Sequence, residues 1–420
     1  MKKLRKFATT LFSICAFASE PKAEFPVSVD QYYSPYMGSD AVLTVHQSLD
    51  ISEQWLSSYE EPKKGLKPSF YRWIDLFLIW TPITMLEEVV QHEVFGHGYR
   101  IRSLKNTEVT GYKFETPSPF GSGGGATSFI VGEKLKIGEL QAINIAGLEA
   151  EDILARQIKF SFFRKNQMDA KLGLLFNLSR LSPLLYSLVD FTSQETLEEK
   201  IFSGNDIQAF MHLNNMMYPQ QTLTKNHITM QLLFNLLDPV IWYKEYNNIY
   251  YVFTGKNISC PMIKIGENFK FLPSFKVTLA PYGLEYTLEN YMLFKDQPIY
   301  AYVKSSEFAF NRALGIGIEA GELFRKDQWS LGAKTHIWIQ PNFLAKWEMV
   351  DVLEEIKPTS FEQASLEKII GAYGGVVGNY FFSGSPNHLF LECGVKSEGY
   401  VEGYPLQGSA VWRVGAKLSF

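Results

Sequence analysis

The chain of 420 residues is long enough for one large folded unit or two ordinary domains. Hydrophobic residues make up 46% of it and charged residues 20%, a balance that excludes a disordered chain. The formal net charge is −4, and basic residues cluster only at the N-terminus. Nucleic acid is therefore not an expected partner.

Residues 1–18 have the pattern of a secretory signal peptide. A basic start precedes the short apolar run Phe7–Phe17, and Ala16-Phe17-Ala18 fits the small-x-small rule for cleavage. Cleavage after Ala18 would remove four lysines and arginines, so a net charge of −4 becomes −4 − 4 = −8. We expect an exported bacterial protein.

Residues 19–70 form an irregular N-terminal segment with one possible strand, Asp40–Ser48. Residues 71–246 have helical periodicity and form the expected metal-binding region. The expected helices are Tyr71–Ser103, Lys136–Lys159, Met168–Phe191, Asp206–Met217 and Thr224–Trp242. Pro82 should kink or interrupt the first of these helices.

Residues 247–420 alternate in the manner of strands. The expected strands are Phe271–Pro281, Leu284–Phe294, Ile299–Ser305, Leu314–Leu323, Gln328–Ile339, Ile370–Phe382, His388–Val395 and Ser409–Phe420. Most have about the 9–11 residues that a tilted membrane strand needs. The acidic segment Val352–Lys368 breaks the pattern and predicts a long loop or short helix.

The end of the chain alternates most regularly. Apolar side chains occupy every second position, at Trp412, Val414, Ala416, Leu418 and Phe420. This pattern resembles the C-terminal signal of bacterial outer-membrane β-barrel proteins. The resemblance implies an outer-membrane location, with membrane lipid and the insertion machinery as partners. An aromatic content of 15% is typical of such proteins.

Together these patterns predict an α+β fold, in which a helical bundle is joined to an antiparallel membrane β-barrel of about 8–12 strands. Strands that cross lipid must pair every backbone N–H and C=O group laterally, which favours closure of the sheet. The two cysteines beyond the signal, Cys260 and Cys393, could pair in an oxidising compartment or remain free thiols.

The residues that carry chemistry are His92-Glu93-Val94-Phe95-Gly96-His97. Zinc hydrolases commonly place two histidines four residues apart, on one helical face. Here the separation is five, and on a regular helix the second ring would point away by about 140°. One π-helical turn would restore a common face, and Gly96 is where that distortion is easiest.

This motif resembles the His-Glu-x-x-Gly-His signature of the dipeptidyl peptidase III family. The resemblance implies that His92 and His97 bind Zn²⁺ and that Glu93 is the general base. It also implies a glutamate as third ligand, further along the chain. The best candidate is Glu149, which shares a helical face with apolar residues and follows His97 by 52 positions; Glu151 is the alternative.

A zinc ion held in this way could activate water for attack on the carbonyl of a peptide or ester. Four residues are possible stabilisers of the transition state: Tyr186, Arg180, His212 and His227. The strand Thr127–Val131 is a candidate for pairing with substrate backbone, and Asp206 receives no role beyond a possible contact behind the ligands. The competing hypothesis is a non-enzymatic outer-membrane barrel for transport, adhesion or structure, with a helical plug.

Overall fold

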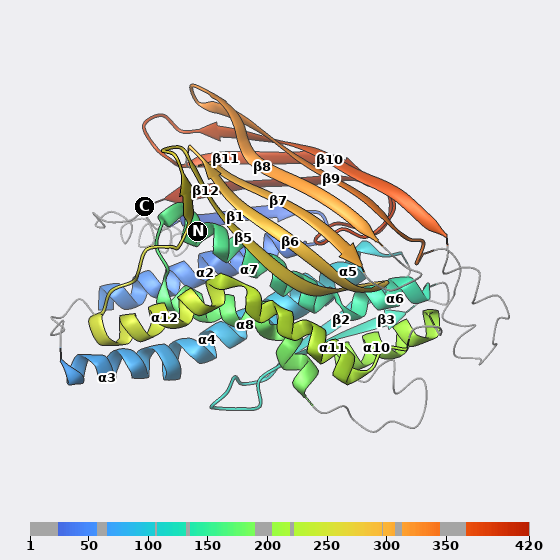
Figure 1. Ribbon diagram of the computed structural model, residues 1–420, viewed down its shortest axis with the longest axis horizontal. Coiled ribbons are helices and arrows are strands. Elements are labelled where there is room, and N and C mark those ends of the chain that lie inside the picture. The colour runs from blue at the N-terminus through green and yellow to red at the C-terminus, as the bar shows by residue number, and fades with distance from the viewer. Residues whose placement is uncertain are drawn as a thin grey trace, which may run out of the picture.

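The computed structural model describes residues 24–56, 65–105, 107–131, 135–189, 204–218, 222–295, 297–306, 313–344 and 367–419. The fold is α+β, and a large antiparallel sheet arches over a layer of helices (Figure 1). The expected signal peptide, Phe420 and most of the expected loop Val352–Lys368 lie outside the described residues.

The sheet has ten strands in the order β1-β12-β11-β10-β9-β8-β7-β6-β5-β4. Their bounds are β1 Glu24–Asp30, β4 Ile263–Ile265, β5 Phe269–Ala280, β6 Gly283–Phe294, β7 Gln297–Ser306, β8 Leu314–Lys326, β9 Trp329–Pro341, β10 Lys368–Phe381, β11 His388–Lys396 and β12 Ser409–Ser419. A strand is present at each of the eight positions expected from the alternating pattern. Every neighbouring pair is antiparallel, so consecutive strands join through simple reversals.

The strands do not close into a barrel, and this part of the prediction is wrong. In the described residues the sheet ends at β1 on one side and at β4 on the other. Strand β4 has only three residues and pairs only with Phe269–Phe271 of β5. Most of β5 therefore lies at an edge, and helices rather than strands cover the two edges.

Side chains from these helices satisfy the edge backbone. Asn235, in the 3₁₀-helix η3 (Leu233–Leu237), accepts from the N–H of Val277 at 2.7 Å and donates to its C=O at 3.0 Å. At the other edge, Thr44 of helix α2 (Pro35–Leu56) donates to the carbonyl of Pro26 at 2.5 Å. An amide side chain thus replaces a neighbouring strand at the edge of β5.

Replacing Asn235 with alanine should destabilise the fold, because two buried backbone groups of Val277 lose their partners. Each unsatisfied group costs about 1–3 kcal/mol. Chemical unfolding of the purified protein measures the loss. Asn226→Ala, at an exposed position of the neighbouring helix α11 (Lys225–Leu232), is the control and should change stability by no more than about 0.5 kcal/mol. Equal stability of the two variants would contradict this account of the edge.

The expected strand Asp40–Ser48 is wrong, because these residues lie within α2. The buried residues of α2 include Tyr36, Ser39, Val42 and His46, which recur at helical spacing of three or four. The N-terminal strand instead occupies the segment just before, as β1. It pairs with β12 over its whole length.

Residues 66–103 form one continuous helical run, built of α3 (Leu66–Ile74), η1 (Asp75–Trp80), α4 (Thr81–His92), η2 (Glu93–His97) and α5 (Gly98–Ser103). Both η1 and η2 are π-helical. Pro82 is the second residue of α4, and the π-helical turn η1 just before it interrupts the regular α-helical bonding at this point. Among the described helices, none combines the length and apolar character needed to cross a membrane.

The remaining helices are α6 (Ile137–Asn144), α7 (Ala146–Lys165), α8 (Ala170–Leu188), α10 (Asp206–Met217) and α12 (Pro239–Thr254). Helix α12 carries the helical region past residue 246. Helix α7 is buried along most of its length and lies beneath the sheet (Figure 1).

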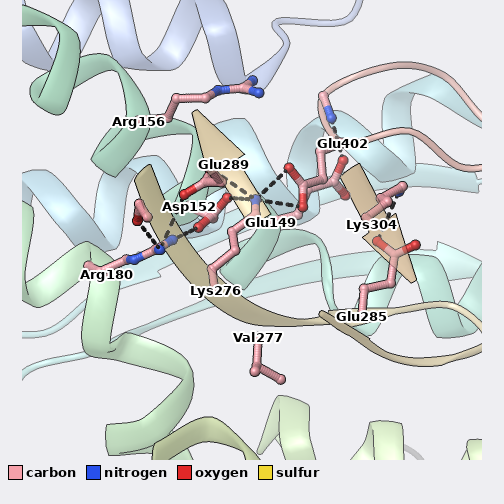
Figure 2. A network of polar contacts seen from close by, with 12 residues as sticks. Glu149, Asp152, Arg156, Arg180, Lys276, Val277, Glu285, Glu289, Lys304 and Glu402 are labelled. Atoms are coloured by element: carbon pink, nitrogen blue, oxygen red, sulfur yellow. Dashed lines mark hydrogen bonds and ion pairs between the residues drawn. The ribbon is translucent and has the colours of Figure 1, made fainter. Parts of the chain in front are cut away.

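Buried ion pairs join α7 to the inner face of the sheet (Figure 2). Asp152 of α7 accepts from Arg180 of α8 at 2.8 Å and also from Lys276 of β5. Lys276 donates in turn to Glu402 at 2.9 Å. The interior between helices and sheet is therefore rich in paired charge, which is unusual for the core of a soluble protein.

Candidate metal centre

The two motif histidines lie on the same side of the long helical run. His92 ends α4, and Glu93–His97 form the π-helix η2. The Nε2 atoms of His92 and His97 are 3.0 Å apart. The expected π-helical turn is confirmed. It makes the spacing of five residues compatible with binding of one metal ion by both histidines.

Glycines allow this turn to pack closely against α7. A Cβ atom at Gly96 would lie 2.6 Å from the carbonyl oxygen of Ala146, and one at Gly147 would lie 2.2 Å from Nε2 of His92. No side chain fits at either position without displacing its neighbour. The close approach of η2 and α7 therefore sets the position of the His92 ring.

The third member of the group is Asp206, the first residue of α10. Its Oδ2 lies 3.0 Å from Nε2 of His92 and 3.3 Å from Nε2 of His97. These three residues are the cluster in the described part of the chain that could hold a metal ion. Tetrahedral zinc with bonds of about 2.0–2.1 Å places its ligand atoms about 3.3 Å apart. The observed triangle is close to that size.

The outer nitrogen of each ring is fixed by an acceptor. Nδ1 of His92 lies 2.7 Å from Oε1 of Glu151, and Nδ1 of His97 lies 2.7 Å from the carbonyl oxygen of Ile143. Both Nδ1 atoms therefore carry hydrogen, and both Nε2 atoms face the Asp206 carboxylate. Burial lowers the pKa of each ring, but Tyr186, Glu151 and Asp206 outweigh burial at His92, and Asp206 outweighs it at His97, so the pKa of both histidines is raised. The carboxylate thus draws positive charge to the two Nε2 atoms, either as ring protons or as a metal ion that replaces them.

The electrostatics of Asp206 agree with this arrangement. Burial opposes its charged form, but His97 and His92 outweigh burial and hold the pKa of Asp206 well below its usual range. The carboxylate therefore stays ionised. When both rings are neutral, Oδ2 of Asp206 and the two Nε2 atoms offer three ligand atoms to one metal ion.

The structure does not bring Glu149, the expected third ligand, to the two histidines. Its carboxylate accepts two hydrogen bonds from Arg100, at 2.6 and 2.7 Å, and one from the backbone N–H of Gly403 at 2.6 Å. A buried arginine, and not a metal ion, thus compensates the charge of this carboxylate. The alternative, Glu151, lies behind His92 as the acceptor for its Nδ1.

Glu93 lies at the start of η2, between the histidines and a two-stranded sheet of β2 (Thr107–Phe114) and β3 (Gly125–Val131). The hydroxyl of Thr127 donates to its Oε2 at 2.6 Å. A Cβ atom at Gly125 would lie 2.8 Å from Cγ of Glu93, so the start of β3 passes close to this carboxylate. A side chain at Gly125, the first residue of β3, would therefore collide with Glu93.

Of the four residues considered as stabilisers of the transition state, Tyr186 lies beside the two histidines. The ring of Tyr186 stacks on His92, with ring centroids 5.6 Å apart and an angle of 15° between the planes. Arg180 lies instead in the ion-pair network of Figure 2, where it bonds Asp152. His212 and His227 do not belong to the three-residue group. Both cysteines, Cys260 and Cys393, are free thiols rather than a disulfide.

Sequence reasoning missed Asp206 because nothing local distinguishes it. An aspartate in the first turn of a helix, after the N-cap Asn205, is favoured by the helix dipole alone. It lies 206 − 97 = 109 residues beyond His97. Only the packing of α10 against the helices of the centre reveals its role.

Comparison of the chain with family models, curated proteins and solved structures gave no match.

Proposed function

We propose that the protein is a zinc-dependent hydrolase, and specifically a peptidase, with His92, His97 and Asp206 as metal ligands and Glu93 as general base. The observation that carries the proposal is the convergence of two Nε2 atoms and one carboxylate oxygen within 3.0–3.3 Å. Both rings are held in the tautomer that metal binding requires, by Glu151 and the backbone of Ile143.

Three protein ligands leave one position of a tetrahedral zinc ion open for water, whose pKa the metal lowers toward neutrality. Glu93 follows His92 directly and would accept the proton of the attacking water. The hydroxyl of Thr127 holds one oxygen of Glu93 and so orients the carboxylate. Tyr186, stacked on His92, is the candidate donor to the oxygen that becomes charged.

A peptide substrate is favoured by the strand beside Glu93. Among the described strands, β3 pairs only with β2, so its second edge has backbone groups available for pairing. An extended peptide can add to such an edge through main-chain hydrogen bonds. The start of β3 touches Glu93, so a peptide aligned with this strand would have its backbone near the base.

The location proposed with this function is the bacterial outer membrane. The N-terminal pattern of residues 1–18 and the alternation in β12 support it. Cell fractionation of the producing bacterium, with the full chain detected by an antibody, tests the location. Recovery of the protein only from the cytosol would contradict it.

The variant Glu93→Gln tests the function. It should bind one equivalent of zinc like the wild type, because Glu93 is not a ligand. Hydrolysis should fall by roughly 10²–10⁴-fold, the usual contribution of a general base. Zinc content is measured on purified protein, and activity on a mixture of quenched fluorescent peptides together with chromogenic esters.

Glu108→Gln, on the adjacent strand β2, is the matched control, because that carboxylate takes no part in the metal group. It should retain both zinc and activity. Zinc-loaded wild type that hydrolyses neither probe would contradict the enzyme and favour a structural metal. Undiminished activity of Glu93→Gln would remove Glu93 as the base.

A further inference from the structure

The polarity of the sheet is inverted relative to a soluble protein. Strand β9 shows the pattern clearly, since Leu331 and Ile337 on its outer face are 59% and 46% exposed. Lys334 and His336 on its inner face are 7% and 1% exposed. Other exposed apolar side chains of the sheet include Val27, Val29, Leu288, Val303, Leu314, Ile316, Ile318, Ile370, Val376, Leu389, Leu391, Val395, Trp412 and Val414.

The helices on the opposite side have the same inversion. In α12 the exposed residues include Trp242, Ile249 and Phe253, whereas Lys244 and Asn247 are buried. Helix α3, which packs beside α12, buries Arg72 and exposes aromatic side chains. Exposed apolar residues of α3, η1 and η3 include Leu66, Phe70, Trp73, Phe77, Leu78, Ile79, Leu233, Phe234 and Leu237.

The two apolar surfaces belong to different layers of the fold. Figure 1 shows strands β8, β9 and β10 in the sheet layer and α3 and α12 in the helical layer beneath it. A second copy of the chain could cover one of these surfaces, but a single dimer contact could not cover both. Lipid acyl chains can cover both surfaces at once, because a fluid lipid phase needs no shape complementarity with the protein.

The backbone at the sheet edges also suits an apolar solvent. Lipid offers no hydrogen bonds, so each backbone group exposed to it needs an internal partner. Asn235 satisfies Val277 at the β5 edge, and Thr44 satisfies Pro26 at the β1 edge. The charged side chains that a water-facing surface would carry lie inside, paired with one another as in Figure 2.

We propose that lipid acyl chains surround the protein on both sides, contacting the outer face of the sheet and also the outward faces of α3, η1 and α12. The open sheet and these helices together then form the surface that contacts lipid within the membrane. Each helix contacts lipid along one face only, and its polar residues face the interior. This inference does not depend on the proposed hydrolase activity.

Tryptophan fluorescence in vesicles of phosphatidylcholine brominated on its acyl chains tests the proposal, because bromine quenches tryptophan only at contact. Single-tryptophan variants of the full chain, with the other tryptophans changed to phenylalanine, report each face. Trp73 and Trp242 report the helices, and Trp412 reports the sheet; they are 45%, 57% and 41% exposed. Trp80 and Trp338, at 1% and 2% exposed, are the interior controls.

The three outward tryptophans should lose emission in brominated vesicles relative to ordinary ones, and the two interior tryptophans should not. Quenching of Trp412 without Trp73 and Trp242 would overturn the proposal, since the helical side would then face something other than lipid. Absence of quenching at all three, with oligomers in detergent-free buffer, would show that protein covers these faces.

If the multiple replacements prevent folding, spin labels give the same comparison in a nearly native chain. Cys393 is exposed on β11 and reports the sheet directly. Phe253→Cys in a Cys393→Ser background reports α12. Both labels should be more accessible to oxygen than to a water-soluble nickel complex, and the reverse result at Phe253→Cys would contradict the proposal.

Discussion

Asp206→Ala should abolish tight zinc binding. The change removes one of three ligands and leaves the Nε2 atoms of His92 and His97 without a counter-charge. Loss of a residue that only supports a ligand typically costs 10–100-fold in metal affinity, so loss of the ligand itself should exceed roughly 100-fold. Isothermal titration of chelator-treated protein with zinc measures the difference, and peptide hydrolysis should disappear with the metal.

The control for this variant is its neighbour. Asn205 caps α10 by accepting from the N–H of Gln208 at 3.0 Å. Asn205→Ala weakens the start of the same helix, by about 0.5–2 kcal/mol, without removing a ligand. Zinc affinity should remain close to that of the wild type. If Asp206→Ala bound zinc as tightly as Asn205→Ala, the third ligand would have to be another residue.

Glu149→Ala should produce a large loss of stability with the metal ligands intact. Arg100 and Glu149 are both buried, and the change leaves the arginine without its carboxylate. Removing one partner of a buried pair costs about 3–5 kcal/mol. The pair also links α5 and α7 to the segment around Gly403 through hydrogen bonds. Chemical unfolding should therefore report the loss of stability for the whole fold.

A double variant distinguishes the loss of the Glu149 side chain from the cost of leaving Arg100 buried without a partner. Arg100→Met with Glu149→Leu removes both charges, and it should recover much of the stability that Glu149→Ala loses. Glu115→Ala, whose partner Lys113 is exposed, should change the unfolding free energy little and serves as the surface control. A stable Glu149→Ala protein with lost zinc binding would restore Glu149 as a ligand and contradict the assignment of Asp206.

Much of the fold follows from local patterns in the sequence. Alternation of apolar and polar residues located the strands from β5 to β12, because the side-chain period of a strand is two whatever lies around it. The spacing of His92 and His97 indicated a π-helical turn, because only an inserted residue brings both rings to one face. The strand predicted at Asp40–Ser48 failed, because a short apolar segment fits either period.

Closure of the sheet and the third ligand were decided by tertiary structure alone. Alternation says which face of a strand is apolar, but it does not say what covers an edge, and here Asn235 takes that place. Likewise, a buried carboxylate needs a positive partner, yet the sequence does not reveal which one. Arg100 pairs with Glu149, and long-range packing brings Asp206 to the histidines, where the three residues form a group that could hold a metal ion.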